Sequence, residues 1–384
     1  MRILHCCPLP SFSGLEQYAL LTAKRQMAMG YDVLFVVQAG STLAKECASA
    51  GVPTLPVTVP QTFTLFSLAS QYALILKSSL ESSTPFDIIH LHSSQDIDRF
   101  GLAFGILKVQ RPTAVRPKLI QQNHIWISHS KKDPLHLFTY HFVDQVWCSS
   151  QAAKKSLESF LPVPKAKIKV VNYGRDLSLR DEFLTRSDAR AKLGLGDDEI
   201  VIGAIARIDP AKGVFELVSA AVNCLREGFK FTLVVIGGPT DAHPPAVKLN
   251  AEILKFLSEL PDSLSRHIKM TGPIENAATL LRAFDVYAQG SYKETFSLAL
   301  LDAQLAGLPV IGTSSGGTPE VVVESRTGWL AEPESVSSMT ETLKRALRDQ
   351  DRWPSFGASA RARVEAEFSL EAAMSQMQIC YTQK

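Results

Sequence analysis

SYKETFSLALLDAQLAGLPV, residues 291–310, is the stretch that decides the fold. A strand is predicted to end just before it, near Gly290, and Glu294 follows in a loop. An apolar helix is predicted from about Phe296 to Ala306, with Gly307 as its stop signal. The next strand begins directly afterwards. A strand, a loop, a helix and a further strand in this order are the repeating unit of a parallel α/β sheet.

The start of this helix is a candidate site for an anion. The backbone N–H groups from Thr295 to Leu298 would point outward there, and the positive end of the helix dipole would attract a phosphate. Asp302 lies further along the helix, so Glu294 and Asp302 would reach opposite ends of a long ligand, one a sugar and the other a ribose. An ordinary amphipathic helix with solvated acidic residues explains the same pattern. Glu294 and Asp302 alone therefore do not distinguish a ligand site from such a helix.

Outward from this stretch, short apolar runs rich in β-branched residues alternate with helix-length patterns along the whole chain. The runs are RILHCC, DVLFVVQAG, TLPVTV, DIIHLH, KLIQQNH and QVWCSS in the first half, then IVIGAIARI, FTLVVIGG, IKMTG, DVYAQGS and LPVIGTSS. Helices are predicted at 214–227 and 277–283, and after Gly328 only helices are predicted, at 336–348, 353–367 and 370–383. This alternation indicates two parallel α/β halves.

The length of 384 residues predicts two domains, each large enough for its own core. The charged and turn-rich stretch 176–198 is the candidate linker. We therefore expect an N-terminal domain over residues 1–176 and a C-terminal domain over residues 177–368. The last helix, 369–384, is expected to cross back to the first domain.

The composition is that of an ordinary globular protein. Hydrophobic residues make up 46% of the chain and charged residues 20%, which excludes extended disorder and collagen-like repeats. The six cysteines form no CxxC pair and no zinc-ligand spacing, so we expect reduced thiols. The apolar run RILHCC is followed directly by Pro8, so it is interpreted as a strand rather than a signal peptide. The uncharged stretch Phe63–Leu76 is too short to span a membrane. We expect a cytoplasmic protein.

The net charge of +2 conceals an asymmetry between the halves. Residues 1–180 contain 19 Lys and Arg against 11 Asp and Glu, whereas residues 181–384 contain 21 against 27. A basic first half could contact an anionic lipid surface at the inner membrane face or a phosphate-bearing acceptor, although scattered lysines more often only solvate a surface. No nucleic-acid partner is expected.

Two further loops favour a ligand site in the second half. ARIDPAKG follows the buried run IVIGAI, which places Arg207 and Lys212 at a strand's carboxyl end, where open α/β sheets bind ligands. Two cations there suit a diphosphate. The loop SSGGTPE supplies Gly316 and Gly317, which permit positive φ angles and close approach. Surface charges and an ordinary glycine turn are the alternative interpretations.

The succession ARIDPAKG, VIGG, TGPI, GSYKETFSLALLDAQLAGLPVI, SSGGTPEVV and RTGWL resembles the nucleotide-sugar domain of the retaining GT-B glycosyltransferases, specifically glycosyltransferase family four. In the first half the resemblance continues with SGLEQY, DIIHLH, QQNH, CSSQAAK and VVNYGRD, and near the end with FSLEAA and Tyr381. The resemblance implies the α/β GT-B fold, in which two Rossmann-like parallel-sheet domains face a central cleft, with the acceptor side first and the donor domain second.

The resemblance also implies roles for single residues in donor binding. Arg207 and Lys212 would hold the donor diphosphate. Asp302 would accept ribose hydroxyls, and Ile274, after Thr271-Gly-Pro, would lie near the nucleobase. The backbone groups that would join the diphosphate site are the N–H groups of Thr295, Phe296, Ser297 and Leu298.

Glu294 and His124 are the residues to which the resemblance gives a catalytic part. Glu294 would contact the transferred sugar near its reacting face, and His124 would touch the sugar and polarise the site. Gly14, in the first strand–helix loop, would let the backbone approach the donor phosphate from the other domain. The chain departs from the family pattern in three places, because Asp302 stands where Glu is usual, Ser13-Gly14 replaces a glycine pair, and QQNH replaces Thr-x-His.

The implied function is a retaining transfer of a hexose-type sugar from a nucleoside-diphosphate sugar to a hydroxyl of a lipid, glycan or small-molecule acceptor, in cell-envelope glycolipid or polysaccharide biosynthesis. UDP is favoured over GDP as the commoner donor nucleotide of the family. No cofactor or metal is expected, since Arg207, Lys212 and the helix start supply positive charge, and Asp96-Ile-Asp98 resembles a metal-binding DxD only in sequence. A GT-B-like nucleotide-sugar epimerase and a non-catalytic nucleotide-sugar-binding protein are the alternatives.

Overall fold

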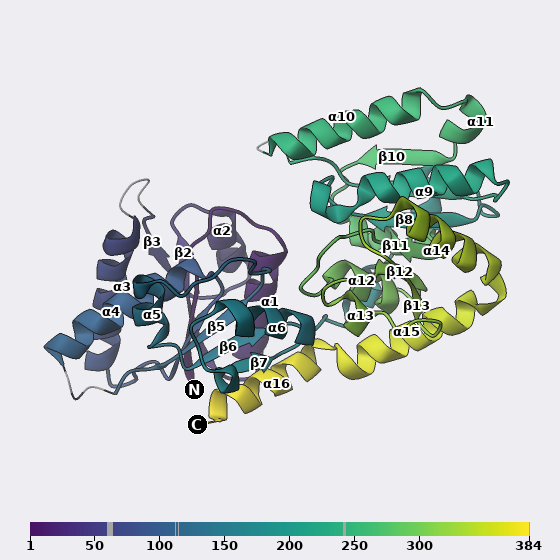
Figure 1. The fold of residues 1–384 in the computed structure, drawn as a ribbon. Helices are drawn as coiled ribbons and strands as arrows, with labels where there is room; N and C mark the ends of the chain where they lie inside the picture. Colours follow the sequence, from purple (N-terminus) through teal and green to yellow (C-terminus); the bar gives the residue numbers. More distant parts are fainter. Residues whose placement is uncertain (60–63, 112, 114, 241–242, 384) are drawn as a thin grey trace. The chain divides into compact units, whose positions relative to one another are not determined.

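The computed structural model describes the chain except residues 60–63, 112, 114, 241–242 and 384 (Figure 1). It divides into two compact units. Unit 1 comprises Met1–Asn172 with Met374–Lys384, and unit 2 comprises Tyr173–Ala373. The predicted stretch Phe63–Leu76 begins outside the described residues, and its described part lies in a helix of unit 1.

Unit 1 is built on a parallel sheet of seven strands in the order β3-β2-β1-β4-β5-β6-β7. The order reverses between β1 and β4, because the chain first builds outward on one side of β1 and then on the other. The strands are β1 Arg2–Cys7, β2 Asp32–Gln38, β3 Thr54–Val57, β4 Ile88–Leu91, β5 Lys118–Asn123, β6 Gln145–Cys148 and β7 Ile168–Val170.

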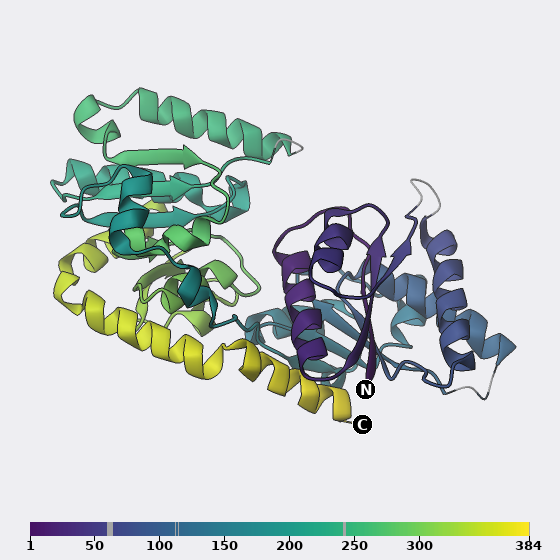
Figure 2. The same cartoon turned by 180° about the vertical axis from the view of Figure 1, so that it is seen from behind.

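Helices cover both faces of this sheet, so the strands are buried on both sides. On β1, Cys6 packs with α3 and α4 on one face, and Cys7 packs with α1 and α2 on the other. The helices are α1 Gly14–Ala28, α2 Thr42–Ser49, α3 Thr64–Glu81, α4 Gln95–Gln110, α5 Pro134–Tyr140, α6 Gln151–Phe160 and the 3-10 turn Lys165–Lys167. Figures 1 and 2 show the amino terminus and the end of α16 (Leu370–Thr382) side by side in unit 1.

Unit 2 repeats the plan with six parallel strands in the order β10-β9-β8-β11-β12-β13. Its order reverses between β8 and β11, and a large apolar core packs β8, β9, β11 and β12 against α9 and α14. The strands are β8 Val201–Ile205, β9 Thr232–Ile236, β10 Ile268–Gly272, β11 Val286–Ala288, β12 Val310–Thr313 and β13 Gly328–Ala331.

The helices of unit 2 include the two long ones predicted after Gly328. Their bounds are α7 Leu179–Glu182, α8 Arg186–Leu193, η2 Pro210–Lys212, α9 Val214–Arg226, α10 Pro244–Ser258, α11 Asp262–Ser265, η3 Ala277–Ala283, α12 Leu298–Leu305, α13 Thr318–Val321, α14 Val336–Arg348, η4 Gln350–Arg352 and α15 Trp353–Glu367. The two Rossmann-like sheets confirm the predicted fold class.

Two local predictions were wrong. The stretch 176–198 is not a linker but part of unit 2, because the fully buried guanidinium of Arg190 donates to the carbonyl oxygens of Ala283 and Glu199 and to the carboxylate of Asp285. A strand, β13, follows Gly328, where only helix was expected. The segment 277–283 is helical, as predicted, and takes the tighter 3-10 form.

Candidate functional site

Three loops of unit 2 meet at the carboxyl ends of β8, β11 and β12. Gly213 and Gly290 face each other so closely that a Cβ on Gly213 would lie 2.0 Å from the carbonyl oxygen of Gly290. Gly316 has a φ of +59°, and a Cβ there would lie 2.1 Å from the carbonyl oxygen of Glu294. Each glycine is therefore required by the packing of one loop on another, at the point where the strand order reverses and open α/β sheets bind ligands.

Lys212 and Glu294 form the centre of this arrangement. Lys212 follows β8 and Glu294 follows β11, and the Lys212 Nζ lies 2.5 Å from the Glu294 Oε1. Gln289 donates from its amide to the same carboxylate oxygen at 3.1 Å. A lysine ammonium has three N–H donors, so Lys212 can hold Glu294 and still donate to a phosphate. The predicted phosphate ligand and the predicted catalytic carboxylate are thus brought together by tertiary structure.

The helix that starts beside Glu294 begins later than predicted, at Leu298 instead of about Phe296. Ser297 is its N-cap and accepts from the N–H of Leu300 at 3.3 Å, while its own hydroxyl donates to the side-chain oxygen of Gln289 at 2.6 Å. Gln289 therefore links the helix cap to Glu294. Sequence analysis did not identify Gln289, because a buried glutamine has no recognisable role until its neighbours are known.

Phe296, just before this helix, is an aromatic residue of the core. Its side chain is buried, with its ring centroid 5.4 Å from that of Phe368 and 5.9 Å from that of Tyr173. Thr295 is also buried. Only the backbone of Phe296 could contribute to a phosphate site, because its side chain belongs to the core.

Arg207 and Ile274 lie in the loops after β8 and β10. Arg207 is exposed and makes no hydrogen bond or ion pair with any residue that the structure describes. Ile274 is 36% exposed, a large fraction for an isoleucine side chain. Both side chains are thus accessible to a ligand, as their predicted roles require.

Asp302 is already paired within unit 2. Its Oδ1 lies 2.5 Å from the Nε of Arg175, in an ion pair without a well-aligned hydrogen bond. Burial raises the pKa of Asp302, and Arg175 partly offsets this effect. A ribose hydroxyl bound by Asp302 would share the carboxylate with Arg175, a partner that sequence analysis did not identify.

In unit 1, Gly14 is the first residue of α1, directly after the loop that follows β1. Its φ is ordinary, and a Cβ at this position would meet nothing within 4 Å. The adjacent helix start is held by Glu16, whose carboxylate accepts from the N–H and the hydroxyl of Ser13, both at 2.8 Å. The fold itself therefore does not require glycine at position 14. The open space beside its Cα is accessible to an approaching ligand.

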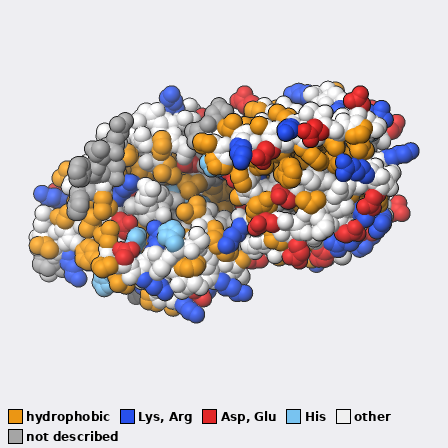
Figure 3. All heavy atoms as spheres, turned by 45° about the horizontal axis from the view of Figure 1, so that its top comes forward, with side chains coloured by type: hydrophobic (Ala, Val, Ile, Leu, Met, Phe, Trp, Pro, Cys, Tyr) orange, Lys and Arg blue, Asp and Glu red, His pale blue; other side chains and the backbone are white. Residues whose placement is uncertain are grey.

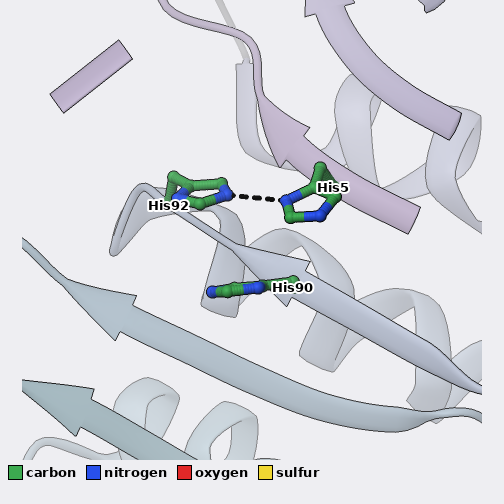
Figure 4. A group of neighbouring side chains, drawn as sticks. All are labelled: His5, His90 and His92. Carbon is green, nitrogen blue, oxygen red and sulfur yellow. Dashed lines mark hydrogen bonds between the residues drawn. The ribbon is translucent and has the colours of Figure 1, made fainter. Parts of the chain in front are cut away.

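His124 follows β5 and is the partly exposed end of a histidine cluster (Figure 4 shows the other three members). Its Nε2 lies 3.2 Å from the Nδ1 of His92, which directly follows β4. The other two members are His5 on β1 and His90 on β4. Every ring nitrogen of His5, His90 and His92 has a hydrogen-bond partner. Burial lowers the pKa of His124 to about 3 and that of His5 to about 4, so both are neutral near pH 7.

The DxD-like pair in α4 has a structural role. Asp96 is fully buried and accepts from the Tyr72 hydroxyl at 3.0 Å and from Arg99 at 2.8 Å. Asp98 accepts from the hydroxyl of Thr139 at 2.6 Å. Because these contacts tie α4 to α3 and α5, the pair is explained without a metal ion.

Two family profiles match the chain, one in each half. "Glycosyltransferase Family 4" matches residues 12–179 and "Glycosyl transferases group 1" matches residues 185–363, so that together they cover most of the sequence. Residues 185–363 therefore form a group 1 glycosyltransferase domain, and residues 12–179 form a glycosyltransferase family 4 domain.

Single proteins agree with this assignment. The group 1 glycosyltransferase is 29% identical over 221 residues to a D-inositol 3-phosphate glycosyltransferase of Nocardia farcinica, covering 57% of this chain and 48% of that one. It is 31% identical over 195 residues to a GDP-mannose-dependent monoacylated alpha-(1-6)-phosphatidylinositol monomannoside mannosyltransferase of Corynebacterium glutamicum, covering 48% of each. The chain spans about half the length of the curated relatives it matches.

A solved structure shows the fold. Anabaena Alr3699/HepE in complex with UDP-glucose superposes with a TM-score of 0.81 at 20% identity and 99% coverage of both chains. At this identity the likeness concerns the fold alone, and it confirms the predicted GT-B architecture. The predicted central cleft remains a prediction.

The surface gives no further support to a membrane contact. Among the helices of the described residues, none is both long and apolar enough to cross a bilayer. On the face shown in Figure 3, basic and acidic side chains are interspersed with apolar ones and do not gather into one patch. None of the six cysteines of the glycosyltransferase forms a disulfide, and all six are buried, as their sequence context predicts.

Gly14→Ala is expected to leave the stability of the glycosyltransferase unchanged and to lower sugar transfer by about tenfold to a hundredfold. The added methyl group meets open space in the free protein, but would displace a phosphate that approaches the backbone. Thermal unfolding and initial transfer rates measure the two effects. Gln17→Ala, on the exposed face of the same helix, is the matched control, and full activity of Gly14→Ala would contradict the role of Gly14.

The buried histidines predict that the glycosyltransferase loses stability in mild acid. Its fold holds the pKa of His5 at about 4, whereas an unfolded histidine titrates near 6.5. Below pH 6.5 the unfolded chain therefore binds protons that the folded chain does not, and the free energy of unfolding falls by about 1.4 kcal/mol per pH unit for such a histidine until about pH 4. Urea unfolding at pH 7 and pH 5 measures this loss. His5→Gln should show a shallower pH dependence, and an equal one would refute the explanation.

Proposed function

We propose that this protein is a retaining, metal-independent glycosyltransferase that moves a hexose-type sugar from a UDP-sugar to an acceptor hydroxyl. The observation that carries the proposal is the contact between Lys212 and Glu294 at the point where the strand order of unit 2 reverses. It places a fixed cation, a carboxylate and the start of α12 side by side. A sugar diphosphate requires these groups, because its phosphate and its sugar carry different charges in the reaction.

The chemistry assigned to these residues follows from the charges that develop. The anomeric C–O bond to the diphosphate breaks, its electron pair stays on the phosphate oxygen, and the sugar carbon becomes oxocarbenium-like. Lys212, Arg207 and the N–H groups at the start of α12 stabilise the leaving diphosphate, each well-placed donor contributing about 3 kcal/mol in comparable sites. Glu294 stabilises the positive charge of the sugar.

Retention of configuration follows if the acceptor attacks from the face that the diphosphate leaves. The acceptor hydroxyl then forms the new C–O bond and gives its proton to the departing phosphate oxygen. The products are the glycosylated acceptor and a nucleoside diphosphate. In this proposal His124 contacts the sugar, Ile274 the nucleobase, and Asp302 together with Arg175 the ribose.

The choice of UDP is supported by the fold neighbour bound to UDP-glucose, although one relative is named for GDP-mannose. The named relatives act on an inositol phosphate and on a phosphatidylinositol mannoside. We therefore propose a polyol or a glycolipid hydroxyl as the first acceptors to screen. A cytoplasmic location and a peripheral membrane contact stay predictions.

Thermal unfolding with UDP, GDP, ADP, UMP and their sugar conjugates, each with and without EDTA, tests the donor site without an acceptor. Stabilisation by UDP and UDP-sugars that EDTA does not alter is the expected result. Stabilisation by GDP alone would correct the nucleotide, sensitivity to EDTA would contradict a metal-independent site, and no stabilisation would contradict the donor site. With an acceptor, product NMR reports the anomeric configuration. Release of an altered sugar nucleotide would instead indicate the epimerase.

A further inference from the structure

The histidine cluster of unit 1 forms a continuous chain of hydrogen bonds that ends at His124. The side-chain oxygen of Gln26, on α1, lies 2.7 Å from the Nε2 of His5. The Nδ1 of His5 lies 2.9 Å from the Nε2 of His92, the bond drawn in Figure 4, and the Nδ1 of His92 lies 3.2 Å from the Nε2 of His124. His5 and His92 thus connect the buried Gln26 to His124, the partly exposed residue of the proposed site.

The sheet explains why these side chains meet. His5 on β1 is in register with His90 on β4, and His92 lies two residues further on. Alternate residues of a strand point to the same face, so His5, His90 and His92 share one face of the sheet. Gln26 of α1 and Tyr381 of α16 contact this same face.

The same nitrogens could suit a metal ion, since ligand atoms of His5, His90 and His92 lie within 4.8 Å of one another. The ring of His90, however, is stacked on that of His92, with centroids 4.6 Å apart and an angle of 20° between the planes (Figure 4). Nitrogen lone pairs lie in the ring plane, so stacked rings do not point at one ion. The ring nitrogens of His90 are also bonded to the Tyr381 hydroxyl at 2.7 Å and to Gln122 at 3.1 Å. The arrangement favours hydrogen bonding.

Each of these histidines is neutral near pH 7. Burial lowers the pKa of His5 to about 4 and of His124 to about 3, and it lowers those of His90 and His92 well below the ordinary value. A neutral imidazole has one N–H and one lone pair. In a chain of N–H···N bonds, the tautomer of one ring therefore fixes the tautomer of the next.

Gln26 sets the direction of the chain. Its amide nitrogen donates to the Tyr381 hydroxyl at 3.0 Å, which turns its carbonyl oxygen toward His5. An oxygen only accepts, so the proton of His5 is on Nε2 and its Nδ1 accepts from His92. By the same rule His92 accepts from the Nε2–H of His124.

We propose that His5 and His92, anchored by Gln26, are positioning residues that hold His124 as its Nε2–H tautomer, with Nδ1 as the hydrogen-bond acceptor of that ring. The inference deepens the proposed function, on which it rests for the role of His124 at the sugar. His124 would then accept a hydrogen bond from a sugar hydroxyl and would not donate one to an oxyanion. A donor sugar that lacks this hydroxyl should be transferred more slowly.

Long-range 1H–15N NMR of the histidine-labelled protein at pH 7 tests the tautomers without any substrate. We expect a protonated Nε2 and an unprotonated Nδ1 for His5, His90, His92 and His124. A protonated Nδ1 on His124 would overturn the proposal. Loss of these signatures on adding one equivalent of Zn2+ would overturn it too, because a metal ion would then replace the hydrogen bonds.

Tyr381→Phe tests the coupling from a distance. It removes the hydroxyl that orients the Gln26 amide, so His124 should show both tautomers, and kcat/KM for transfer should fall by about tenfold or less. Binding of UDP should not change. Tyr140→Phe is the matched control, since its buried hydroxyl has no hydrogen-bond partner among the described residues. A single, unchanged His124 tautomer in folded Tyr381→Phe would overturn the anchoring by Gln26.

The two proposals fail in different ways. If His124→Ala transfers sugar at the wild-type rate while the NMR tautomers are as expected, the proposed role of His124 at the sugar is wrong and the hydrogen-bond chain stands. If His124→Ala is inactive but His124 of the wild type is protonated on Nδ1, the chain is wrong and the proposed function stands.

Discussion

Glu294→Gln is expected to reduce sugar transfer by a factor of about a hundred to a thousand while UDP still binds. The amide keeps the size of the side chain and can still contact Lys212, but it removes the negative charge that opposes the developing charge on the sugar. Initial rates of transfer and the affinity for UDP, measured by calorimetry, separate the two effects. If Glu294 had only a structural role, the variant would lose transfer activity and UDP affinity together.

The control for this experiment is Glu252→Gln, which removes one carboxylate from the exposed face of α10 in the same unit. Glu294→Ala should lose at least as much activity as Glu294→Gln, because it also leaves Lys212 without its carboxylate partner. Wild-type rates in Glu294→Gln would show that the carboxylate is not catalytic, whatever the state of UDP binding.

The second large effect is expected in donor affinity. Arg207→Ala and Lys212→Ala should each weaken UDP binding by about 10- to 100-fold, since a hydrogen bond to a charged group contributes about 1.5–3 kcal/mol. The double variant should bind UDP more weakly than either single variant. Because the contacts are ionic, added salt should weaken wild-type binding more than it weakens binding by the double variant.

Arg266→Ala and Lys248→Ala are suitable controls, because both remove an exposed cation of unit 2 outside the three loops of the site. Binding of UMP, which has one phosphate, shows which of the two UDP phosphates these residues contact. If Arg207 and Lys212 hold mainly the second phosphate, their loss should matter less for UMP than for UDP. Unaltered UDP affinity in the double variant would remove both residues from the donor site.

Much of the architecture could be predicted because it depends on local patterns. Runs such as FTLVVIGG are apolar along most of their length, as expected for a strand that is buried on both faces of a sheet. In the structure this run contains β9. The helices at 336–348 and 353–367 have the predicted bounds.

The predictions failed where a segment is short or where its structure depends on residues far away in the sequence. The strand Gly328–Ala331 is too short to show periodicity. The predicted linker belongs to unit 2 because its buried Arg190 donates a hydrogen bond to the carbonyl oxygen of Ala283.

The candidate site was only partly predictable for the same reason. The sequence placed Lys212 and Glu294 after strands, and a parallel sheet brings such positions to one edge. Their direct contact, across 82 positions of sequence, depends on which strands are neighbours. Arg175 and Tyr381 belong to the stretches that carry the family resemblance, but no role was predicted for them, and Gln26 and Gln289 had no sequence signal. A polar residue gains its role only from the partner that burial forces on it.

The sequence by itself determined the alternation of strands and helices, the parallel sheets that follow from it, and the loops in which charged residues stand, because these depend on periodicity and on turn residues near in the chain. Only the tertiary structure decided which of these residues meet. Strand order sets Lys212 beside Glu294, and the sheet face under α1 and α16 collects His5, His90 and His92. The physical reason is that burying a polar group is costly unless another group satisfies it, and that partner can come from any part of the chain.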